Sequence, residues 1–561
     1  MLRALSTWLY DGDPLALVAF ERPLEMVKAL WSENPPYFEG LIRDHMLGNP
    51  HRATLKLLPD PELLKRLEAE ERRWLERTKA MMSPAELEAL LESTLRSREL
   101  QEVTVTSETS VVLPTLRRVD LTPEVLRIPL EISEEAQTHV LYHPLTTNSI
   151  LYLDLGFDLR VLPQDLLPYA TVFGQLLLEI DPNLARRISG LAGGIHVRIL
   201  ASEAKGDMPG PIWLFLRGKT MADKADELLS ILHDMLSAVN FDNPERFSRI
   251  ARRERARREA EMWRGSRMLN LRLRAHFSEA AWVDDQLTGI GSLPSLDRMI
   301  REAETDWPSV LERLETLRTA LVNRNAMLIN ITLDPPSCSR FRPLLTSFLE
   351  DLPISPVDRA HWSLSELPTK EGFIIPSEVN YVGKGADLFR LGYTLHGSIF
   401  AIVRYLNMSW LWSKVREEGG AYGVYAMFDH LSGVFTFLSL HDPHLVQTLN
   451  VYDGTGDFLR HSTLSEDELM GSVIGAVGEL ERFQSTSDQG FISMARYLTG
   501  EDDETRQRLL EELLSTTSAH FKEFADILDA LRREGYTVIL ADEERLRRAG
   551  LPPHHLSNVK L

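Results

Sequence analysis

The hydrophobic and polar positions along the chain follow the same order of elements twice. The first copy is predicted to open with an apolar strand at residues 150–157 and a helix that ends near residue 180. A glycine pair, Gly193-Gly194, then precedes strands at 195–200 and 212–216, an amphipathic helix at 221–239, further helices and a closing strand at 326–331. This alternation of strand-like and helix-like patterns predicts helices packed against a sheet.

The second copy repeats this order closer to the carboxyl end. Its elements are an opening strand at 379–382, a helix at 395–416, the glycine pair Gly419-Gly420, strands at 422–428 and 434–440, a helix at 444–459 and a closing strand at 536–541. The second glycines of the two pairs are 226 residues apart (from 194 to 420), and Met327 and Thr537 of the closing strands are 210 apart. Two similar offsets on matching elements predict an α+β fold of two tandem domains, each with helices against one face of a largely antiparallel sheet.

A third, partial copy stands at the start of the chain. Residues 54–58 resemble the closing strand at 328–332, and helical runs at 15–30 and 36–46 precede them. We therefore expect the chain to begin inside a domain whose first part is absent. Such a fragment needs more chain or a partner to cover its sheet.

Residues 61–102 are rich in Glu, Arg, Leu and Ala, with a break in the middle. At this break Ser83 is a good helix N-cap, Pro84 suits the first helical position and Glu86 completes a capping box. The segment predicts a two-helix hairpin, followed by an extended connector at 101–113. The predicted organisation is an incomplete domain at 1–60, hairpin and connector at 61–120, and full domains at 121–345 and 346–561.

Composition narrows the class of protein. Of the 561 residues, 43% are hydrophobic and 26% charged, as in globular proteins, and no apolar run approaches the roughly 20 residues of a membrane span. The single cysteine, Cys338, fits a reducing compartment, and the amino terminus has no signal-peptide pattern, so we expect a soluble, cytoplasmic protein without a membrane partner. A net charge of −20 argues against nucleic acid as a partner. The arginine-rich run at 246–258 is interleaved with glutamates and predicts a solvated helix face.

Candidate chemistry is sparse. Neither His-Glu-x-x-His nor its inverse His-x-x-Glu-His occurs, and no Gly-x-Ser-x-Gly elbow or phosphate loop is present. His441 and His444 are three residues apart, but Pro443 lies between them and Asp442 is better suited to cap a helix. We predict no metal site in this chain.

One junction combines residues that could bind a peptide. The second predicted helix ends at Arg416, the pair Gly419-Gly420 permits a sharp reversal, and the next strand begins at Tyr422. Arginine offers a fork of donors for peptide carbonyls or a carboxylate, and tyrosine offers a hydroxyl for a developing oxyanion. A structural role explains the same residues: Arg416 stabilises a helix C-terminus and Tyr422 packs on the sheet. Spacing alone favours the structural role.

The stretch Val415-Arg-Glu-Glu-Gly-Gly-Ala-Tyr-Gly423, together with residues 8–14, 376–382 and 439–445, is similar to the pitrilysin/insulinase-type zinc peptidases, most closely their presequence protease branch. The similarity runs through nearly the whole chain in order. It implies a clamshell of four domains in two halves, with residues 61–102 as the hinge, around a chamber that takes unfolded peptides.

The resemblance also implies roles for single residues. Zinc belongs to the amino-terminal half, which has no counterpart here, so we expect zinc in the complete enzyme and none on this chain. The carboxy-terminal half supplies an Arg and a Tyr that hold the peptide and polarise its scissile carbonyl. Arg416 and Tyr422 match these positions, with Gly419 and Gly420 in the substrate-binding turn and Tyr422 as the catalytic contact.

Two functions follow from these expectations. The favoured one is the carboxy-terminal half of a presequence-protease-like zinc metalloendopeptidase that degrades short unfolded peptides. Such a chain is inactive alone and needs an amino-terminal catalytic half, on a separate chain or on a missing upstream segment. The alternative is a non-catalytic peptide-binding or assembly subunit. Intact Arg416 and Tyr422 favour the first.

Overall fold

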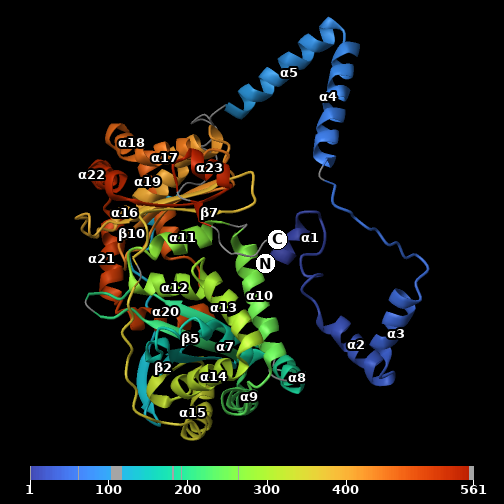
Figure 1. Cartoon of the computed structure of the whole chain (residues 1–561), viewed down its shortest axis with the longest axis vertical. Coiled ribbons are helices and arrows are strands. Elements are labelled where there is room, and N and C mark those ends of the chain that lie inside the picture. The colour runs from blue at the N-terminus through green and yellow to red at the C-terminus, as the bar shows by residue number, and fades with distance from the viewer. Residues whose placement is uncertain are drawn as a thin grey trace. The chain divides into compact units, whose positions relative to one another are not determined.

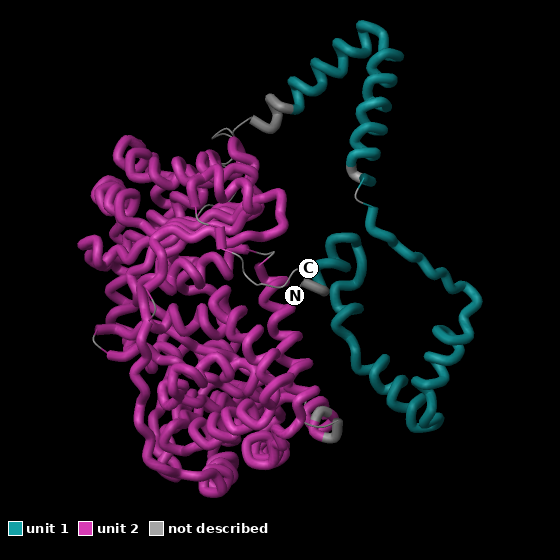
Figure 2. Tube along the Cα trace, viewed as in Figure 1, with its two compact units in different colours: residues 1–114 teal, residues 115–561 magenta. Residues whose placement is uncertain are grey.

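The computed structural model describes residues 2–60, 62–102, 116–179, 182–190, 193–206, 208–262, 265–364, 366–551 and 553–554. The chain divides into two compact units, unit 1 (Met1–Pro114) and unit 2 (Thr115–Leu561), shown in Figure 2. Both glycine pairs of the repeat lie in unit 2. The candidate chemistry therefore belongs to unit 2 alone.

Unit 1 consists of helices joined by irregular segments (Figure 1). They are α1 (Leu2–Trp8), α2 (Glu21–Glu33), α3 (Tyr37–Leu41), the π-helix η1 (Ile42–Leu47), α4 (Leu63–Met81) and α5 (Pro84–Glu102). The capping box expected before α5 is present: the Ser83 N–H donates to the Glu86 carboxylate at 2.8 Å, and the Glu86 N–H donates to the Ser83 hydroxyl at 3.3 Å. The connector predicted at 101–113 lies outside the described residues from residue 103 onward.

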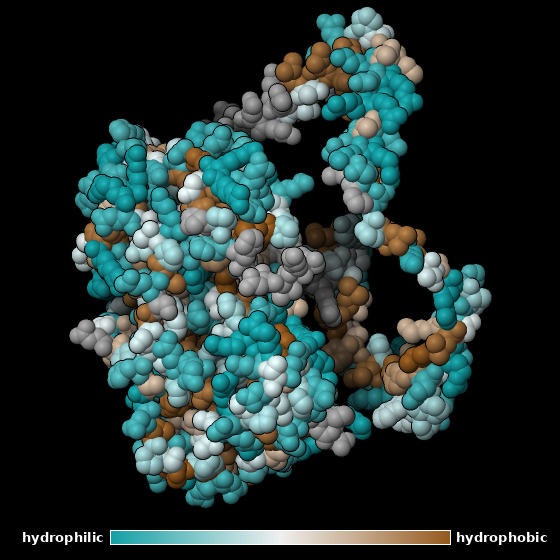
Figure 3. Space-filling view, viewed as in Figure 1, coloured by the Kyte–Doolittle hydropathy of each residue, from teal (hydrophilic) through white to brown (hydrophobic). Residues whose placement is uncertain are grey.

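The closing strand predicted at residues 54–58 is not a strand. Residues 51–60 have no regular secondary structure and are exposed throughout. A strand is held by hydrogen bonds from a neighbouring strand, and the described part of unit 1 contains none to supply them. Large apolar side chains of unit 1 remain exposed, and brown areas mark them in Figure 3; examples are Trp8 (64%), Tyr10 (86%) and Leu57 (86%).

Unit 2 is built on two six-stranded sheets (Figure 1). The first has the order β1-β2-β6-β3-β5-β4, with strands β1 (Glu131–Glu135), β2 (Thr138–Pro144), β3 (Ile150–Asp158), β4 (Ile195–Ala201), β5 (Ile212–Met221) and β6 (Met327–Leu333). The second has the order β12-β7-β11-β8-β10-β9, with β7 (Lys370–Ile374), β8 (Tyr381–Asp387), β9 (Gly423–Phe428), β10 (Val434–Leu440), β11 (Tyr536–Ala541) and β12 (Pro553–His554).

The strand orders confirm the predicted repeat. The series β2-β6-β3-β5-β4 of the first sheet matches β7-β11-β8-β10-β9 of the second. The pairs β2-β6 and β7-β11 are parallel in both, and the remaining pairs of the two series are antiparallel. In each sheet the strand that follows the glycine pair, β4 or β9, lies at the edge. The α+β fold class is therefore confirmed.

Helices cover both sheets. Those that follow the strands of the first copy are α7 (Tyr169–Leu178), α8 (Pro182–Gly190), α9 (Ala225–Ser237), α10 (Pro244–Met262), α11 (Ser266–Arg274), α12 (Glu279–Thr288), α13 (Ser292–Thr305), α14 (Trp307–Leu321) and α15 (Pro335–Glu350). Those of the second copy are α16 (Ser398–Met408), α17 (Val446–Asp453), α18 (Thr455–His461), α19 (Glu466–Leu480), α20 (Thr486–Thr499), α21 (Asp503–Leu514), α22 (Ser518–Glu534) and α23 (Glu543–Arg548). Helix α15 runs across the predicted boundary at 345, and the domain boundaries stay predictions. No described helix is long and apolar enough to cross a membrane.

Each copy also covers the second face of the other copy's sheet. Leu269 of α11 packs against Val538 of β11, and Phe491 of α20 packs against Phe215 of β5, with ring centroids 5.5 Å apart. The prediction of helices on one face only is therefore wrong for both sheets. This exchange explains why the two sheets form a single compact unit.

A buried ionic cluster fixes α11 and α12 to the second sheet. Arg272 of α11 donates to Glu371 of β7 at 2.7 and 2.8 Å, and to Asp285 of α12 at 2.9 Å. Asp285 and Glu371 are buried, with 0% and 3% of their surface exposed. Burial raises the pKa of Asp285, so Arg272 is needed to keep this carboxylate charged.

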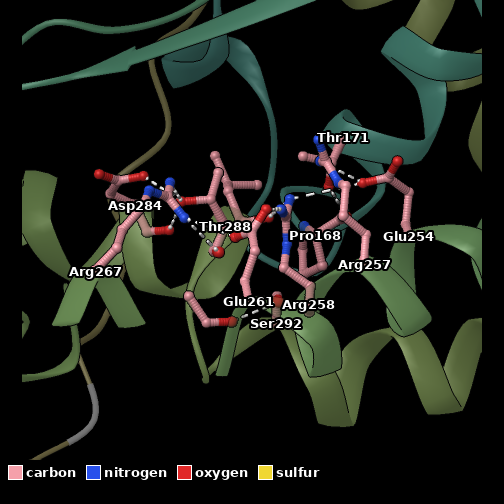
Figure 4. Close-up of polar contacts among 12 residues, drawn as sticks. Pro168, Thr171, Glu254, Arg257, Arg258, Glu261, Arg267, Asp284, Thr288 and Ser292 are labelled. Carbon is pink, nitrogen blue, oxygen red and sulfur yellow. Dashed lines mark hydrogen bonds and ion pairs between the residues drawn. The ribbon is translucent and has the colours of Figure 1, made fainter. Parts of the chain in front are cut away.

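The arginine-rich helix α10 is only partly solvated. Arg258 is 3% exposed, contrary to the prediction of a solvated face, and burial lowers its pKa to about 10. Its guanidinium lies 3.7 Å from Glu254 and 3.8 Å from Glu261. Each carboxylate has a closer partner, Arg257 at 2.6 Å and Arg267 at 3.1 Å (Figure 4). Arg258 is therefore a buried cation with loosely placed counter-charges.

Candidate functional site

The candidate junction begins with a break in the helix that was predicted at 395–416. Helix α16 ends at Met408, and Ser409 takes a non-helical conformation (φ −117°, ψ −92°). The chain then forms a π-helix, η6 (Trp412–Glu417), in which the Glu418 N–H donates to the Ser413 carbonyl at 2.9 Å. Single π-turns are rare and occur often at functional sites. The predicted continuous helix is thus corrected to a helix, a break and a π-turn.

The two glycines are required for different reasons. Gly420 has φ +74°, in the left-handed region that favours glycine. At Gly419 an added Cβ would lie 2.5 Å from the Val415 carbonyl oxygen, which is closer than van der Waals contact permits. The pair thus lets the chain reverse tightly after η6, with the Ala421 N–H donating to the Val415 carbonyl at 3.0 Å.

The reversal brings Arg416 and Tyr422 together. The Arg416 Nη1 donates to the backbone carbonyl of Tyr422, and its guanidinium lies 5.7 Å from the centre of the Tyr422 ring. Arg416 is half-buried, whereas Tyr422 is 68% exposed. Such exposure disagrees with a packing role for Tyr422 on the sheet. It leaves the phenol available to a ligand.

Two further residues belong to this arrangement and carried no recognisable signal as site residues. Trp412 of η6 lies under the Arg416 guanidinium, 4.3 Å from its ring centre, and donates from Nε1 to the Glu417 carboxylate at 3.0 Å. The His441 ring lies 5.7 Å from the Tyr422 ring. Trp412 is one helical turn before Arg416, a spacing that brings side chains together. For His441 only the folded sheet reveals the contact.

Asp442, which the sequence suggested as a helix cap, stabilises the turn before α17 instead. Its carboxylate accepts the His444 N–H at 2.9 Å and the Thr448 hydroxyl at 2.7 Å, while Leu445 is the N-cap. Asp442 is fully buried, and burial raises its pKa. In the part of the chain that the structure describes, no three His, Cys, Asp or Glu side chains are placed to hold a metal ion together.

The first copy offers an internal comparison. At the 226-residue offset, Arg416 and Tyr422 correspond to Gly190 and His196. The turn geometry is shared, since Gly194 has φ +69° and Gly420 has φ +74°. The backbone device is thus common to both copies. The Arg and Tyr side chains occur in the second copy alone.

Comparison with known proteins identifies the class. A family profile described as "PreP C-terminal domain" matches residues 370–543, and a profile for the segment associated with peptidases of the M16 family, subgroup C, matches residues 57–299. The chain is 35% identical over 571 residues to presequence protease 1 (chloroplastic/mitochondrial) of Arabidopsis thaliana, an alignment that covers 100% of this chain and 53% of that protein. It is 25% identical to the protein HypA of Clostridium perfringens, covering 97% of this chain and 56% of that protein. The chain therefore spans about half the length of these relatives.

Solved structures agree on the fold. A peptidase M16 inactive domain from Pseudomonas fluorescens superposes with a TM-score of 0.55 at 16% identity, covering 74% of this chain and 98% of that one. A protease from Helicobacter pylori gives 0.52 at 15% identity, covering 74% and 99%. Two tandem sheets of one topology thus define a peptidase of the M16, or pitrilysin, type. Within that class, the chain belongs to the presequence protease family, as its motifs predicted.

Proposed function

We propose that this chain forms the carboxy-terminal half of a presequence-protease-like zinc metalloendopeptidase that degrades short unfolded peptides. The observation that carries the proposal is the meeting of Arg416 and Tyr422 across one tight turn, with the phenol of Tyr422 exposed. The family membership and the half-length coverage of the relatives support it.

The two side chains have complementary chemistry. The Arg416 guanidinium has five N–H donors, so those not engaged by the Tyr422 carbonyl remain for peptide carbonyls or a carboxylate. The exposed hydroxyl of Tyr422 can donate to the oxygen on which charge develops when a peptide carbonyl is attacked. In this proposal Arg416 holds the peptide in the turn of Gly419 and Gly420, and Tyr422 is the catalytic contact.

The described residues do not fit zinc, because no three potential ligands lie together. We therefore assign zinc to an amino-terminal half, on a separate chain or on an upstream segment, and derive no step through the metal. The exposed apolar side chains of unit 1 support a protein partner, since burying them is favourable. The net charge of −20 suits a basic peptide.

A cytoplasmic location is proposed from the sequence alone. Relatives are named for other compartments: presequence protease 1 of Arabidopsis thaliana is chloroplastic/mitochondrial, and the presequence protease of Danio rerio is mitochondrial. Fractionation of the native host, with detection of this chain in each compartment, tests the location.

Reconstitution tests the function. The chain is mixed with an amino-terminal segment that carries His-x-x-Glu-His, and cleavage of a fluorogenic unfolded peptide is followed with and without a chelator. We expect chelator-sensitive cleavage by the mixture and none by the chain alone. Tyr422→Ala should abolish most of this cleavage, whereas His196→Ala, at the matching position of the first copy, should not. Robust chelator-sensitive cleavage by the chain alone contradicts the proposal.

The same mixture separates the alternative, a non-catalytic peptide-binding or assembly subunit. The Pseudomonas fluorescens protein of the same fold is an inactive domain, and this likeness gives the alternative its support. If the chain binds both the peptide and the amino-terminal segment but the assembled complex cuts nothing, the alternative is correct.

A further inference from the structure

The side chains of the candidate site form one row of stacked planar groups, which we call the stacked row. Successive neighbours are 4.3, 5.7, 5.7 and 5.4 Å apart. In order, its members are Trp412, Arg416, Tyr422, His441 and Tyr381. They come from η6, the glycine turn, the segment after β10 and strand β8. The row therefore connects an exposed phenol to the interior of the second sheet.

The inner end of the stacked row is fixed. Tyr381 is 1% exposed and packs in the same cluster as Leu269 of α11 and Val538 of β11. Gly265, before α11, lies so close that an added Cβ would be 1.8 Å from the Tyr381 ring. Close packing on all sides leaves the Tyr381 ring one position.

His441 connects this fixed ring to Tyr422 and has an unusual backbone to do so. Its φ is +45°, which is rare for a residue with a Cβ and costs of the order of 1–3 kcal/mol unless the surroundings impose it. The surroundings do impose it: the Tyr422 N–H donates to the Leu440 carbonyl at 3.1 Å on one side. On the other, Asn380 and Asp442 exchange backbone hydrogen bonds of 2.8 and 2.9 Å.

A glycine or asparagine would satisfy this backbone at a lower cost than histidine does. A ring at this position therefore needs a reason beyond the turn. The His441 ring provides one, because it stands between Tyr381, at an interplanar angle of 81°, and Tyr422, at 42°. Strain retained at one residue beside an exposed phenol is typical of functional sites.

We propose that His441 is a positioning residue for Tyr422. Its ring transmits the fixed position of Tyr381 to the exposed phenol and so restricts the directions in which the Tyr422 hydroxyl points. The consequence for peptide binding rests on the proposed function above. The positioning itself does not, because it concerns contacts within this chain.

The test uses the full chain with His441→Asn and His441→Gly, both of which suit a positive φ and remove the ring. Tyrosines are labelled with fluorine, and the Tyr422 resonance is assigned by its loss in Tyr422→Phe. We expect the resonance to shift and narrow in both variants, as the freed ring samples more positions. The midpoint of thermal unfolding should stay the same or rise, since strain is relieved. His461→Asn, on exposed helix α18, is the control and should change neither.

Peptide binding gives the second readout. A fluorescein-labelled, arginine-containing unfolded peptide should bind His441→Asn about two- to ten-fold more weakly, the range expected from the loss of one aromatic contact. In a Tyr422→Ala background, His441→Asn should have no further effect, because His441 acts through Tyr422.

An unchanged Tyr422 resonance together with a lowered unfolding midpoint would overturn the proposal and return His441 to a purely structural role. An equal loss of affinity in the Tyr422→Ala background would also overturn it. If the resonance responds but the wild-type chain binds no peptide, the proposed function fails while the positioning of Tyr422 by His441 stands.

Discussion

Replacing the two glycines of the candidate turn one at a time tests how that turn is built. At Gly420 the space is open, since an added Cβ meets only the Pro443 ring at 3.7 Å, so the cost of alanine comes from φ +74° alone. A left-handed alanine costs about 1–2 kcal/mol, and roughly half is offset by the lower entropy of the unfolded chain. We therefore expect Gly420→Ala to destabilise the turn by about 1 kcal/mol.

Gly419→Ala should cost more. Its Cβ would lie 2.5 Å from the Val415 carbonyl oxygen and 3.0 Å from that of Lys414. Both oxygens belong to the backbone of η6, which cannot move aside as a flexible side chain can. Overpacking against fixed atoms typically costs about 1–3 kcal/mol, and we expect at least about 2 kcal/mol here.

Hydrogen exchange of the turn amides measures these costs locally. The Gly420 N–H donates to the Arg416 carbonyl at 2.9 Å and the Ala421 N–H to the Val415 carbonyl at 3.0 Å, so their exchange reports opening of the turn. Gly420→Ala should accelerate exchange about five-fold and Gly419→Ala about thirty-fold or more. Gly420→Asn, which tolerates a positive φ, is the control and should exchange nearly as the wild type. Equal acceleration at the two positions, or a larger effect at 420, refutes this reading of the turn.

Three further predictions concern the core that supports the site. Arg272→Met leaves two buried carboxylates without their partner and should lower the free energy of unfolding by about 3–5 kcal/mol in urea denaturation. Arg258→Met, the matched control, should be neutral or stabilising, because each carboxylate near Arg258 has a closer arginine; a loss as large as that of Arg272→Met would show that its long contacts matter. Burial and the neighbouring His396 lower the pKa of His520, which accepts the Thr517 N–H at 3.1 Å at the start of α22. The unfolded chain then binds more protons, so stability should fall as the pH drops below about 6.5, the ordinary value for histidine. His520→Gln keeps an acceptor without titrating, and an unaltered pH dependence of the α22 amides in this variant would exclude His520 as the cause.

Much of the fold follows from local patterns. Strands β10 and β11 begin and end where the predicted strands do, because apolar runs bounded by turn residues mark them directly. The reciprocal covering of the sheets by α11 and α20 could not be predicted in this way. A helix with one apolar stripe does not reveal which of two similar sheets it will cover.

The candidate site was only half visible in the sequence. The motif named Arg416 and Tyr422, and the glycine pair predicted the reversal between them. The π-turn at η6 was missed because its residues fit an ordinary helical pattern, and a π-turn adds only one residue to the ring of each hydrogen bond. His441 was considered as a metal ligand, whereas its contacts with two tyrosines depend on the pairing of β8 and β10.

The most direct test of the proposed role of Arg416 and Tyr422 is the steady-state kinetics of Tyr422→Phe in the enzyme reconstituted with its amino-terminal half. This change removes the exposed hydroxyl and keeps the ring stacked between Arg416 and His441. An oxyanion contact strengthens in the transition state, so kcat should fall by about a hundred-fold while KM changes far less. An unchanged kcat would contradict a catalytic contact and return Tyr422 to a role in binding or packing.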